Sequence, residues 1–377
     1  MCKARSLLRA TCVRVRTDLA GRMERVLSFA ALAVRDAMTR QQNGAGRVMR
    51  HTGLLLGMQL LLMALAGGAA ASGADEAPAT VDMTVRQVSE HVYYVEGESG
   101  QATGSNQGFV ANAGFIVTGA GVVVFDALGS PALARLLLEK IHGITDEPVV
   151  RVVVSHYHAD HIYGLQVFAD LDAEVLAPDG ADEYLDSDQA AQRLEERRNT
   201  LAPWVNENTH LISPDQYLGE GTRFRLGDVE FIITLLGAAH SDGDLAMYVS
   251  PDRVLFSGDV VFNERVPFLG DADTRHWLKV LERMDREKLT ALVPGHGSVS
   301  NDPRKAIDFT RRYLEYLRKT MGAAVQGLVA FGDAYAGVDW SGFDMLPAFS
   351  EANRRNAYQV YLSMEAEMLR EKTLPAN

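Results

Sequence analysis

Cysteine is almost absent from this chain of 377 residues, which has only Cys2 and Cys12. Both lie in an N-terminal stretch that we expect to be absent from the mature protein. Disulfides and thiolate chemistry are thereby excluded from the functional part of the chain. The lack of cysteine suits an oxidising compartment, although it does not prove one.

Long hydrophobic runs are also scarce, and the main one covers residues 54–65. It follows Arg50 and precedes a run of small residues, in "MRHTGLLLGMQLLLMALAGGAAASGADEA". This order is typical of a secretory signal peptide. A membrane anchor is the alternative, but the run is shorter than the ~20 residues that a span needs. We predict a signal peptide over 49–74, cut after Ala71 or Ala74, and a periplasmic or secreted protein without a stable membrane span after cleavage.

The preceding stretch, residues 1–48, is rich in arginine and shows no strand pattern. A signal peptide normally starts a chain, and Met23 and Met38 are alternative methionines within this stretch. We interpret it as a non-native extension from an over-extended translation start. A disordered basic extension is the alternative.

Basic side chains become scarce once the N-terminal stretch is set aside. Residues 1–71 hold 11 of the 37 Lys and Arg and 3 of the 49 Asp and Glu, which leaves 26 basic and 46 acidic side chains and a net charge of about −20. Such a surface repels phosphate backbones, so we expect no nucleic-acid partner.

Short apolar runs come in two batches from Val85 onward, and each batch is followed by a helical pattern and a further strand. This order fits two packed sheets with helices outside, built as two similar halves. We predict helices over 130–143, 161–171 and 181–202, and a mostly helical part from Pro303 that "GDAYAGVDWSGFDMLP" interrupts.

Three of the ten histidines lie within "HYHADH", together with a carboxylate. His156 and His158 end a buried strand, where alternate residues point to one side, and Asp160 and His161 lie where the chain turns away. Imidazole nitrogens and carboxylate oxygens are good ligands for zinc and similar first-row ions. The position after a strand places the cluster at the carboxyl end of a sheet, where sites on α/β frameworks gather.

Three more candidate ligands follow strands later in the chain. His240 lies in "GAAHSDGD", Asp259 in "FSGDVVF" and His296 in "VPGHG", each beside small residues that let the backbone approach. Four other histidines lack such company, and we interpret them as surface or packing residues: His91, His142, His210 and His276.

These four motifs resemble the motif series of the metallo-β-lactamase fold superfamily over residues 85–300. The resemblance implies an α/β (α+β) fold: a four-layer αβ/βα sandwich over 85–300 as the catalytic domain, with a helical C-terminal extension packed on it over 301–377. It also implies two metal ions, zinc by expectation, with iron or manganese as alternatives. The implied ligands are His156, His158 and His240 for one ion, Asp160, His161 and His296 for the second, and Asp259 as the bridge.

The sequence departs from the class B β-lactamases of this superfamily. Two of their subclasses have cysteine where this chain has Asp259, and the third has serine. Aspartate is typical of glyoxalase II-like and lactonase-like members. Persulfide dioxygenases share many of these ligands but use one iron. Along its whole length, the chain resembles a periplasmic branch called SoxH-like or quinoprotein-relay metallohydrolases, through "RVPFLGDADTRHW" and "NRRNAYQVYLSMEAEM".

Three segments are candidates for shaping a pocket: 97–108 as a flap, 263–273 beside the metals, and 181–202 as a lid or a solvated face. Tyr163 and Phe268 are candidate lining or core residues. Asp242 and Asp244 either orient a ligand histidine or form a turn.

We predict a secreted or periplasmic dinuclear zinc hydrolase that uses a metal-bridging hydroxide, oriented by Asp160, on a small ester, thioester, lactone or amide. The alternatives are a mononuclear-iron persulfide dioxygenase-like oxygenase, a class B β-lactamase-like hydrolase, and a non-catalytic metal-bearing partner of a periplasmic redox system or quinoprotein.

Overall fold

The computed structural model describes residues 77–270, 272–284 and 288–373 of the chain. The segments predicted as an extension and a signal peptide, 1–48 and 49–74, lie outside the described residues. Among the helices that are described, none is long and apolar enough to cross a membrane.

The first sheet contains seven strands, whose spatial order follows their order in the chain. The first four pair antiparallel, and parallel pairing begins between the fourth and the fifth strand. The last strand was not predicted, because its three residues alternate too briefly to show a pattern. The strands are β1 (Val85–Gln87), β2 (Val92–Val95), β3 (Ala113–Val117), β4 (Val122–Phe125), β5 (Val149–Val153), β6 (Glu174–Pro178) and β7 (Gln216–Leu218).

The second sheet contains five strands in the reverse order, from the last strand of the chain to the eighth. The eleventh and twelfth strands of the chain pair parallel, and the other neighbouring strands pair antiparallel. The two predicted batches of strands are therefore confirmed as two sheets. The strands are β8 (Arg223–Leu226), β9 (Val229–Gly237), β10 (Asp244–Ser250), β11 (Val254–Phe256) and β12 (Ala291–Val293).

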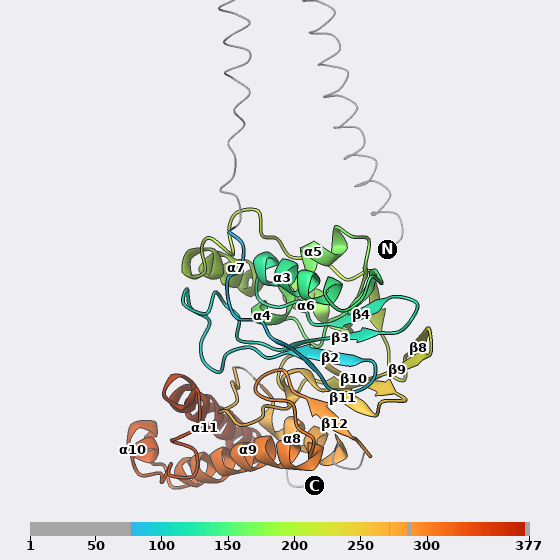
Figure 1. Ribbon diagram of the computed structural model, residues 1–377. Coiled ribbons are helices and arrows are strands. Elements are labelled where there is room, and N and C mark those ends of the chain that lie inside the picture. The colour runs from blue at the N-terminus through green and yellow to red at the C-terminus, as the bar shows by residue number, and fades with distance from the viewer. Residues whose placement is uncertain (1–76, 271, 285–287, 374–377) are drawn as a thin grey trace, which may run out of the picture. The chain divides into compact units, whose positions relative to one another are not determined.

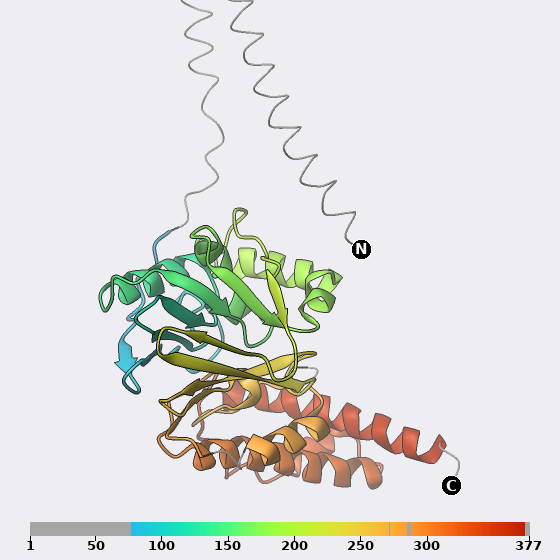
Figure 2. The same ribbon diagram turned by 90° about the vertical axis from the view of Figure 1, so that its right-hand side faces the viewer.

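Helices cover the outer face of each sheet, and the two sheets pack against each other, which gives four layers (Figure 1, Figure 2). Alternate residues of β4 show the arrangement: Val122 and Val124 join the core beneath the helices, whereas Val123 and Phe125 join the core between the sheets. The Phe125 ring meets that of Phe256 from β11, with centroids 5.0 Å apart. The predicted four-layer sandwich is confirmed.

The helices over the first sheet begin with α3 (Pro131–His142), which starts where predicted because Ser130 Oγ accepts a hydrogen bond from Leu133 N at 3.2 Å. The prediction of one helix over 161–171 was wrong: α4 (Ala159–Ile162) and α5 (Leu165–Ala169) are separate. The predicted helix over 181–202 is also divided, into α6 (Ala181–Leu185) and α7 (Asp188–Thr200), since Ser187 caps the second part.

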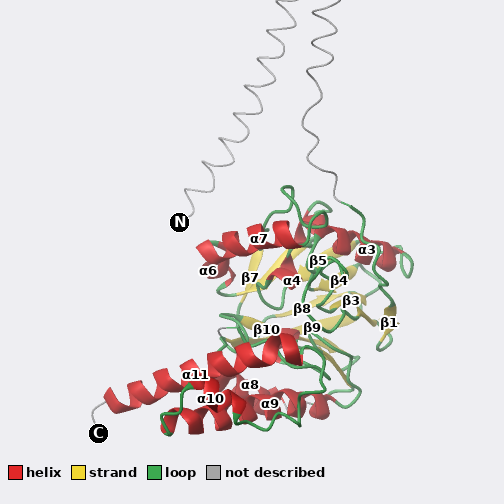
Figure 3. Ribbon diagram, turned by 90° about the vertical axis from the view of Figure 1, so that its left-hand side faces the viewer, coloured by secondary structure: helices red, strands yellow, loops and turns green. Residues whose placement is uncertain are grey.

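Four helices cover the second sheet: α8 (Thr274–Met284), α9 (Pro303–Gln326), α10 (Phe331–Ala336) and α11 (Phe349–Thr373). Their apolar faces share one core with β9–β12 and include Trp277, Leu314 and Val360. The interruption predicted after α9 contains the short helix α10. Figure 3 shows α11 crossing this layer and extending beyond it at its C-terminal end.

Candidate metal centre

The first half of the chain brings four candidate ligands to one sheet edge. His156 and His158 follow β5, and Asp160 and His161 lie on α4, whose first turn they share. His156 and His161 are completely buried, and the Asp160 side chain is 23% exposed. The strand end and the turn of helix thus present four ligand-type groups within six residues.

The second half supplies the other three from separate strand ends. His240 lies in the connection from β9 to β10, Asp259 in the short 3-10 helix η1 (Gly258–Val260) after β11, and His296 after β12. Glycine is required beside the last: a Cβ at Gly295 would lie 2.0 Å from Asp259 Oδ1. The small residues noted in these motifs therefore allow the strand ends to approach each other.

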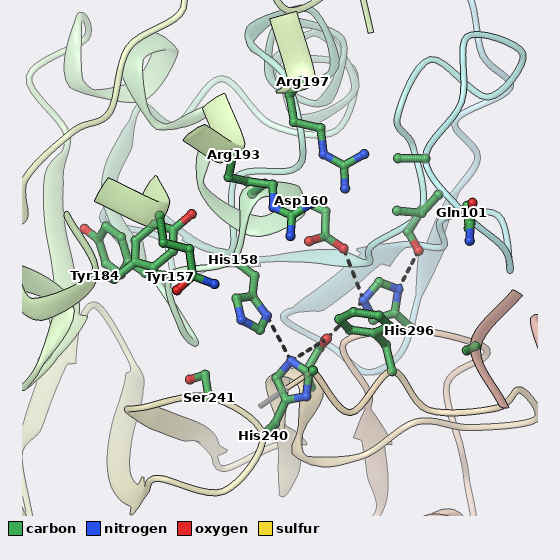
Figure 4. Close-up of a pocket in the computed structure, with 18 of the residues that line it drawn as sticks. Gln101, Tyr157, His158, Asp160, Tyr184, Arg193, Arg197, His240, Ser241 and His296 are labelled. Atoms are coloured by element: carbon green, nitrogen blue, oxygen red, sulfur yellow. Dashed lines mark hydrogen bonds and ion pairs between the residues drawn. The ribbon is translucent and has the colours of Figure 1, made fainter. Parts of the chain in front are cut away.

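The seven side chains form two adjoining groups, and within each group the ligand atoms lie within 4.8 Å of one another. Figure 4 shows His158, Asp160, His240 and His296 of these seven. Asp259 contacts both groups: Oδ2 lies 3.3 Å from His240 Nε2, and Oδ1 lies 3.2 Å from His161 Nε2. The first group is His156, His158, His240 and Asp259, and the second is Asp160, His161 and His296.

Several buried atoms of this cluster lack a hydrogen-bond partner among the described residues. They are His156 Nε2, His161 Nε2, His240 Nδ1 and Asp259 Oδ1. Unpaired buried polar atoms are costly, and a cation in the cluster would supply the missing partner of His156 Nε2, His161 Nε2 and Asp259 Oδ1. His240 faces the cluster with Nε2, so its unpaired Nδ1 is not part of this argument. The donor set of imidazoles and carboxylates fits zinc or another first-row ion. The cluster therefore indicates a metal cofactor.

Burial and neighbouring charges set the protonation of these ligands. Burial lowers the pKa of His240 to about 3, and burial together with His161 and His158 holds the pKa of His156 well below its usual range. Burial raises the pKa of Asp259, but His296 and His161 outweigh it and leave the pKa well below its usual range. The neutral imidazoles of His240 and His156 and the ionised Asp259 are the forms that bind metal. Burial lowers the pKa of His161 as well, but Asp259, Asp126 and Asp160 outweigh it and hold that pKa well above its usual range.

Asp126 supports one histidine of each group, His161 directly and His156 through Ser155, although the sequence reasoning missed it. It follows β4 and accepts three hydrogen bonds, from Ser155 N at 2.7 Å, Ser155 Oγ at 2.8 Å and His161 Nδ1 at 2.8 Å. Ser155 Oγ lies 2.9 Å from His156 Nδ1. One carboxylate therefore orients two histidines. Its signal was present in "VVVFD", an aspartate directly after a buried strand.

Asp244 holds the loop of His240. Its carboxylate accepts hydrogen bonds from the backbone N–H groups of Ala239, His240 and Ser241 at 2.8–3.1 Å and from Ser241 Oγ at 2.8 Å. Asp244 therefore fits both interpretations given above: it stabilises a turn, and that turn positions His240. Asp242, by contrast, lines the cavity.

Asn112 performs the corresponding task for His296 and was also missed. Its Nδ2 donates to the carbonyl oxygens of Pro294 and Gly297, both at 2.8 Å. His296 Nδ1 lies 2.7 Å from the carbonyl oxygen of Val110. A segment before β3 in the first half therefore orients a ligand-type residue of the second.

A cavity of 510 Å³ opens over the cluster and is lined by all three segments predicted to shape a pocket. The flap contributes Gln101, α7 contributes Arg193 and Arg197, and the segment after Asp259 contributes Arg265 and Phe268. Tyr163, in contrast, is fully buried in the core beneath α3.

The four other histidines that the structure describes are absent from the two ligand groups. His91 Nδ1 lies 2.8 Å from Asp252 Oδ2, and His276 Nε2 lies 2.9 Å from the carbonyl oxygen of Leu236. These contacts fit the packing and surface roles expected of them.

Comparison with known proteins agrees with this arrangement. The model of the metallo-beta-lactamase superfamily matches residues 106–296, which is half of the chain. The chain belongs to the metallo-β-lactamase superfamily. The match begins before β3 and ends at His296, so it includes all seven candidate ligands.

Two curated relatives are hydrolases. Metallo-beta-lactamase IND-1 from Chryseobacterium indologenes is 25% identical over 234 residues, which cover 61% of this chain and 85% of that protein. Acyl-coenzyme A thioesterase MBLAC2 from Gallus gallus is 28% identical over 173 residues, 42% of this chain and 60% of that protein. The prediction of a metal-dependent hydrolase of this superfamily is confirmed at the level of the family.

Solved structures show the same fold. The sec-alkylsulfatase Pisa1 from Pseudomonas sp. matches with a TM-score of 0.59 and 19% identity, over 74% of this chain and 50% of that chain. Metallo-beta-lactamase IND-7 matches with a TM-score of 0.50 and 20% identity, over 63% of this chain and all of that chain. This chain spans half the length of the alkylsulfatase, and the likeness concerns the sandwich.

Proposed function

We propose that this chain is a dinuclear zinc hydrolase that acts on a small ester, thioester, lactone or amide. The observation that carries the proposal is the position of Asp259, whose two carboxylate oxygens contact histidines of both ligand groups. A carboxylate between two sets of donors suits a pair of ions better than a single one. The residues of the two groups would hold two zinc ions, and such ions would supply the Lewis acidity that polarises a carbonyl group and lowers the pKa of water.

Side chains of the protein would orient the attacking water molecule and restrain the metal ligands. Asp160 is the more exposed of the two cluster carboxylates, at 23% against 4% for Asp259, and it lines the cavity. Its Oδ2 lies 3.3 Å from His296 Nε2, which fixes its direction. It is therefore placed to orient an attacking water molecule and to accept its proton. The Phe262 ring stacks on His296 at 5.2 Å and restrains that ligand.

A mononuclear-iron oxygenase remains the competing chemistry that the resemblance implied, and Asp259 argues against it because one ion leaves the second group without a cation. A quinoprotein or other redox partner stays a prediction of the resemblance to the SoxH-like branch.

A hydrolysis panel on the metal-loaded protein tests the proposal. We expect turnover of at least one class among activated esters, thioesters, lactones and amides, loss of that turnover after chelation, and its return with zinc. Oxygen consumption with a persulfide, together with one iron per chain and no hydrolysis, would establish the oxygenase instead.

A further inference from the structure

Arg265 is a buried cation at the wall of the candidate active site. It follows η1, lines the cavity, and is only 4% exposed. Its guanidinium carbon lies 5.8 Å from the centre of the Phe262 ring, and Phe262 in turn stacks on His296. An arginine is rarely buried unless it is paired, so its hydrogen bonds need to be accounted for.

Few acceptors within the protein satisfy this guanidinium. Nε donates to the carbonyl oxygen of Val266 at 3.4 Å, and NH1 lies 3.3 Å from His296 Nδ1. That nitrogen lies closer to the carbonyl oxygen of Val110, at 2.7 Å, and donates its proton there. It then has no lone pair for Arg265.

Carboxylates do not pair with Arg265 either. Asp259, Asp160 and Glu351 act on it electrostatically, yet among the described residues no carboxylate forms an ion pair with it within 4.0 Å. Two of these three are candidate metal ligands, whose negative charge bound cations would offset. Arg265 lines the cavity, and its NH1 and NH2 groups form a fork of donors without a carboxylate partner among the described residues.

We propose that Arg265 binds an oxyanion group of the substrate, so that the hydrolase acts on an ester or thioester that carries a carboxylate, sulfonate or phosphate near the scissile bond. This inference rests on the proposed hydrolase function. A planar fork of N–H donors matches two oxygens of such a group. The oxyanion would supply acceptors that the described residues do not.

The charges of the other wall agree with an anionic substrate. Arg193 and Arg197 lie one turn apart on α7 and extend into the cavity above Asp160 (Figure 4). Arg193 pairs with Glu196 at 2.6 Å, whereas no contact of Arg197 within ion-pair distance occurs among the described residues. Arg355 also lines the cavity, as do the acidic Asp242 and Glu351. The cavity is lined by four arginines and by five carboxylates, so cations bound at the cluster would be needed to turn its balance of charge towards anions.

Two esters with one leaving group test the inference on the metal-loaded enzyme: 4-nitrophenyl acetate, which is neutral, and mono-4-nitrophenyl succinate, which carries a carboxylate. The wild-type protein should prefer the succinate ester in kcat/KM by about 10- to 100-fold, the effect of a hydrogen bond to a charged group. Arg265→Gln should lose most of this preference through KM, and Arg265→Lys should retain an intermediate part. The matched control is Arg223→Gln, which removes an exposed arginine outside the cavity.

Calorimetric titration with methanesulfonate gives a second readout that needs no turnover. Sulfonates are weak metal ligands, so binding should depend on Arg265 and fall at least about tenfold in Arg265→Gln. Circular dichroism and melting curves establish that each variant is folded. Equal preference and equal sulfonate affinity in the wild type and Arg265→Gln would overturn the inference, as would a wild-type protein with neither property.

The two proposals fail in distinguishable ways. If the protein hydrolyses esters without preferring an anionic group and does not bind sulfonate, the oxyanion site is refuted and the proposed hydrolase function is supported. If sulfonate binding depends on Arg265 but the protein hydrolyses no substrate of the panel, the oxyanion site is supported and the proposed hydrolysis is refuted.

Discussion

Single residues outside the ligand set determine how the candidate metal centre is held. Asp126 is not itself a candidate metal ligand, yet it fixes Ser155 and the candidate ligand His161 through three hydrogen bonds of 2.7–2.8 Å. It is 1% exposed, so no solvent competes for these bonds. The geometry of the cluster therefore depends on a residue one layer further from the cavity.

Asp126→Asn should weaken metal binding without unfolding the sandwich. The amide retains the shape but loses the charge, and one of its two positions donates where the carboxylate accepts. Residues that orient metal-binding histidines typically contribute 10- to 100-fold in metal affinity, so we expect a loss of about that size in chelator competition. Asp146→Asn, at an exposed site, is the control, and equal affinity in both variants would show that Asp126 does not position the ligands.

The seven candidate ligands could be predicted because each is a ligand-type residue just past a strand. Asp126 fits the same pattern and was missed only because no neighbouring histidine drew attention to it. Asn112 and Arg265 could not have been found this way. Asn112 acts through a hydrogen bond to a carbonyl group 185 residues away, and Arg265 is distinguished by its burial and its lack of partners. Neither property leaves a local pattern in the sequence.

Elements were predictable where their signals are local. Ser130 and Pro131 set the start of α3. The division between α4 and α5 has a cause that lies elsewhere in the chain. The N–H group of Gly164 donates to the carbonyl oxygen of Leu128 at 3.1 Å and so does not continue the helix, and a Cβ at Gly164 would lie 1.9 Å from the carbonyl oxygen of Ala127. The close approach of β4's continuation, not the helical propensity of "HIYGLQVFADL", decides where the helix breaks.

The helices of the second half are joined by one acidic side chain. Glu367 of α11 accepts from Arg318 of α9 at 2.8 and 3.1 Å and from Arg275 of α8 at 2.5 Å. Its side chain is 18% exposed. The pKa of Glu367 lies below its usual range: burial raises it, but the hydrogen bonds and charges of Arg318 and Arg275 lower it further.

Glu367→Gln should therefore destabilise the protein by about 1 kcal/mol at pH 7, or about 2–4 °C in Tm. Because the folded pKa is depressed, the stabilisation is complete above the unfolded pKa and is lost as the pH falls through the folded value. Thermal melting of both proteins from pH 7 to pH 3 should show the difference shrinking with acidity. A difference that grows with acidity, or one equal to that of the exposed Glu315→Gln, would contradict this role.

At the scale of the whole molecule, the two halves meet at a site whose charge bears on substrate choice. Asp259 adds a second carboxylate where class B β-lactamases place a thiolate or a serine, so the site is harder and more negative. That should disfavour the open arrangement that stabilises an anionic amide nitrogen. Arg265 can bind the carboxylate of a β-lactam, so binding alone will not discriminate.

We therefore expect weak or absent β-lactam hydrolysis beside faster turnover of activated esters or thioesters, measured in parallel on zinc-loaded protein. The test is demanding because a curated relative of this chain, IND-1, is a metallo-beta-lactamase. Penicillin or carbapenem turnover with kcat/KM above about 10⁵ M⁻¹s⁻¹ lies in the range of natural substrates and would identify a β-lactamase.

Processing concerns the part of the chain outside the described residues. We propose export followed by cleavage, on the strength of the signal-like segment 49–74 and the lack of later cysteines. The mature protein should begin between Ser72 and Ala77 and be released by osmotic shock. An intact mass that includes residues 1–48 would disprove it.

The central claim is that two metal ions share Asp259, and metal content per chain tests it most directly. Elemental analysis of the purified wild-type protein should find about two zinc ions per chain. Asp259→Ala should lower that content and abolish hydrolysis while circular dichroism remains unchanged, because the sandwich core does not include this side chain. Asp344→Ala, an exposed control, should do neither. One iron per chain in the wild type, or the same metal content in the wild type and Asp259→Ala, would contradict the account.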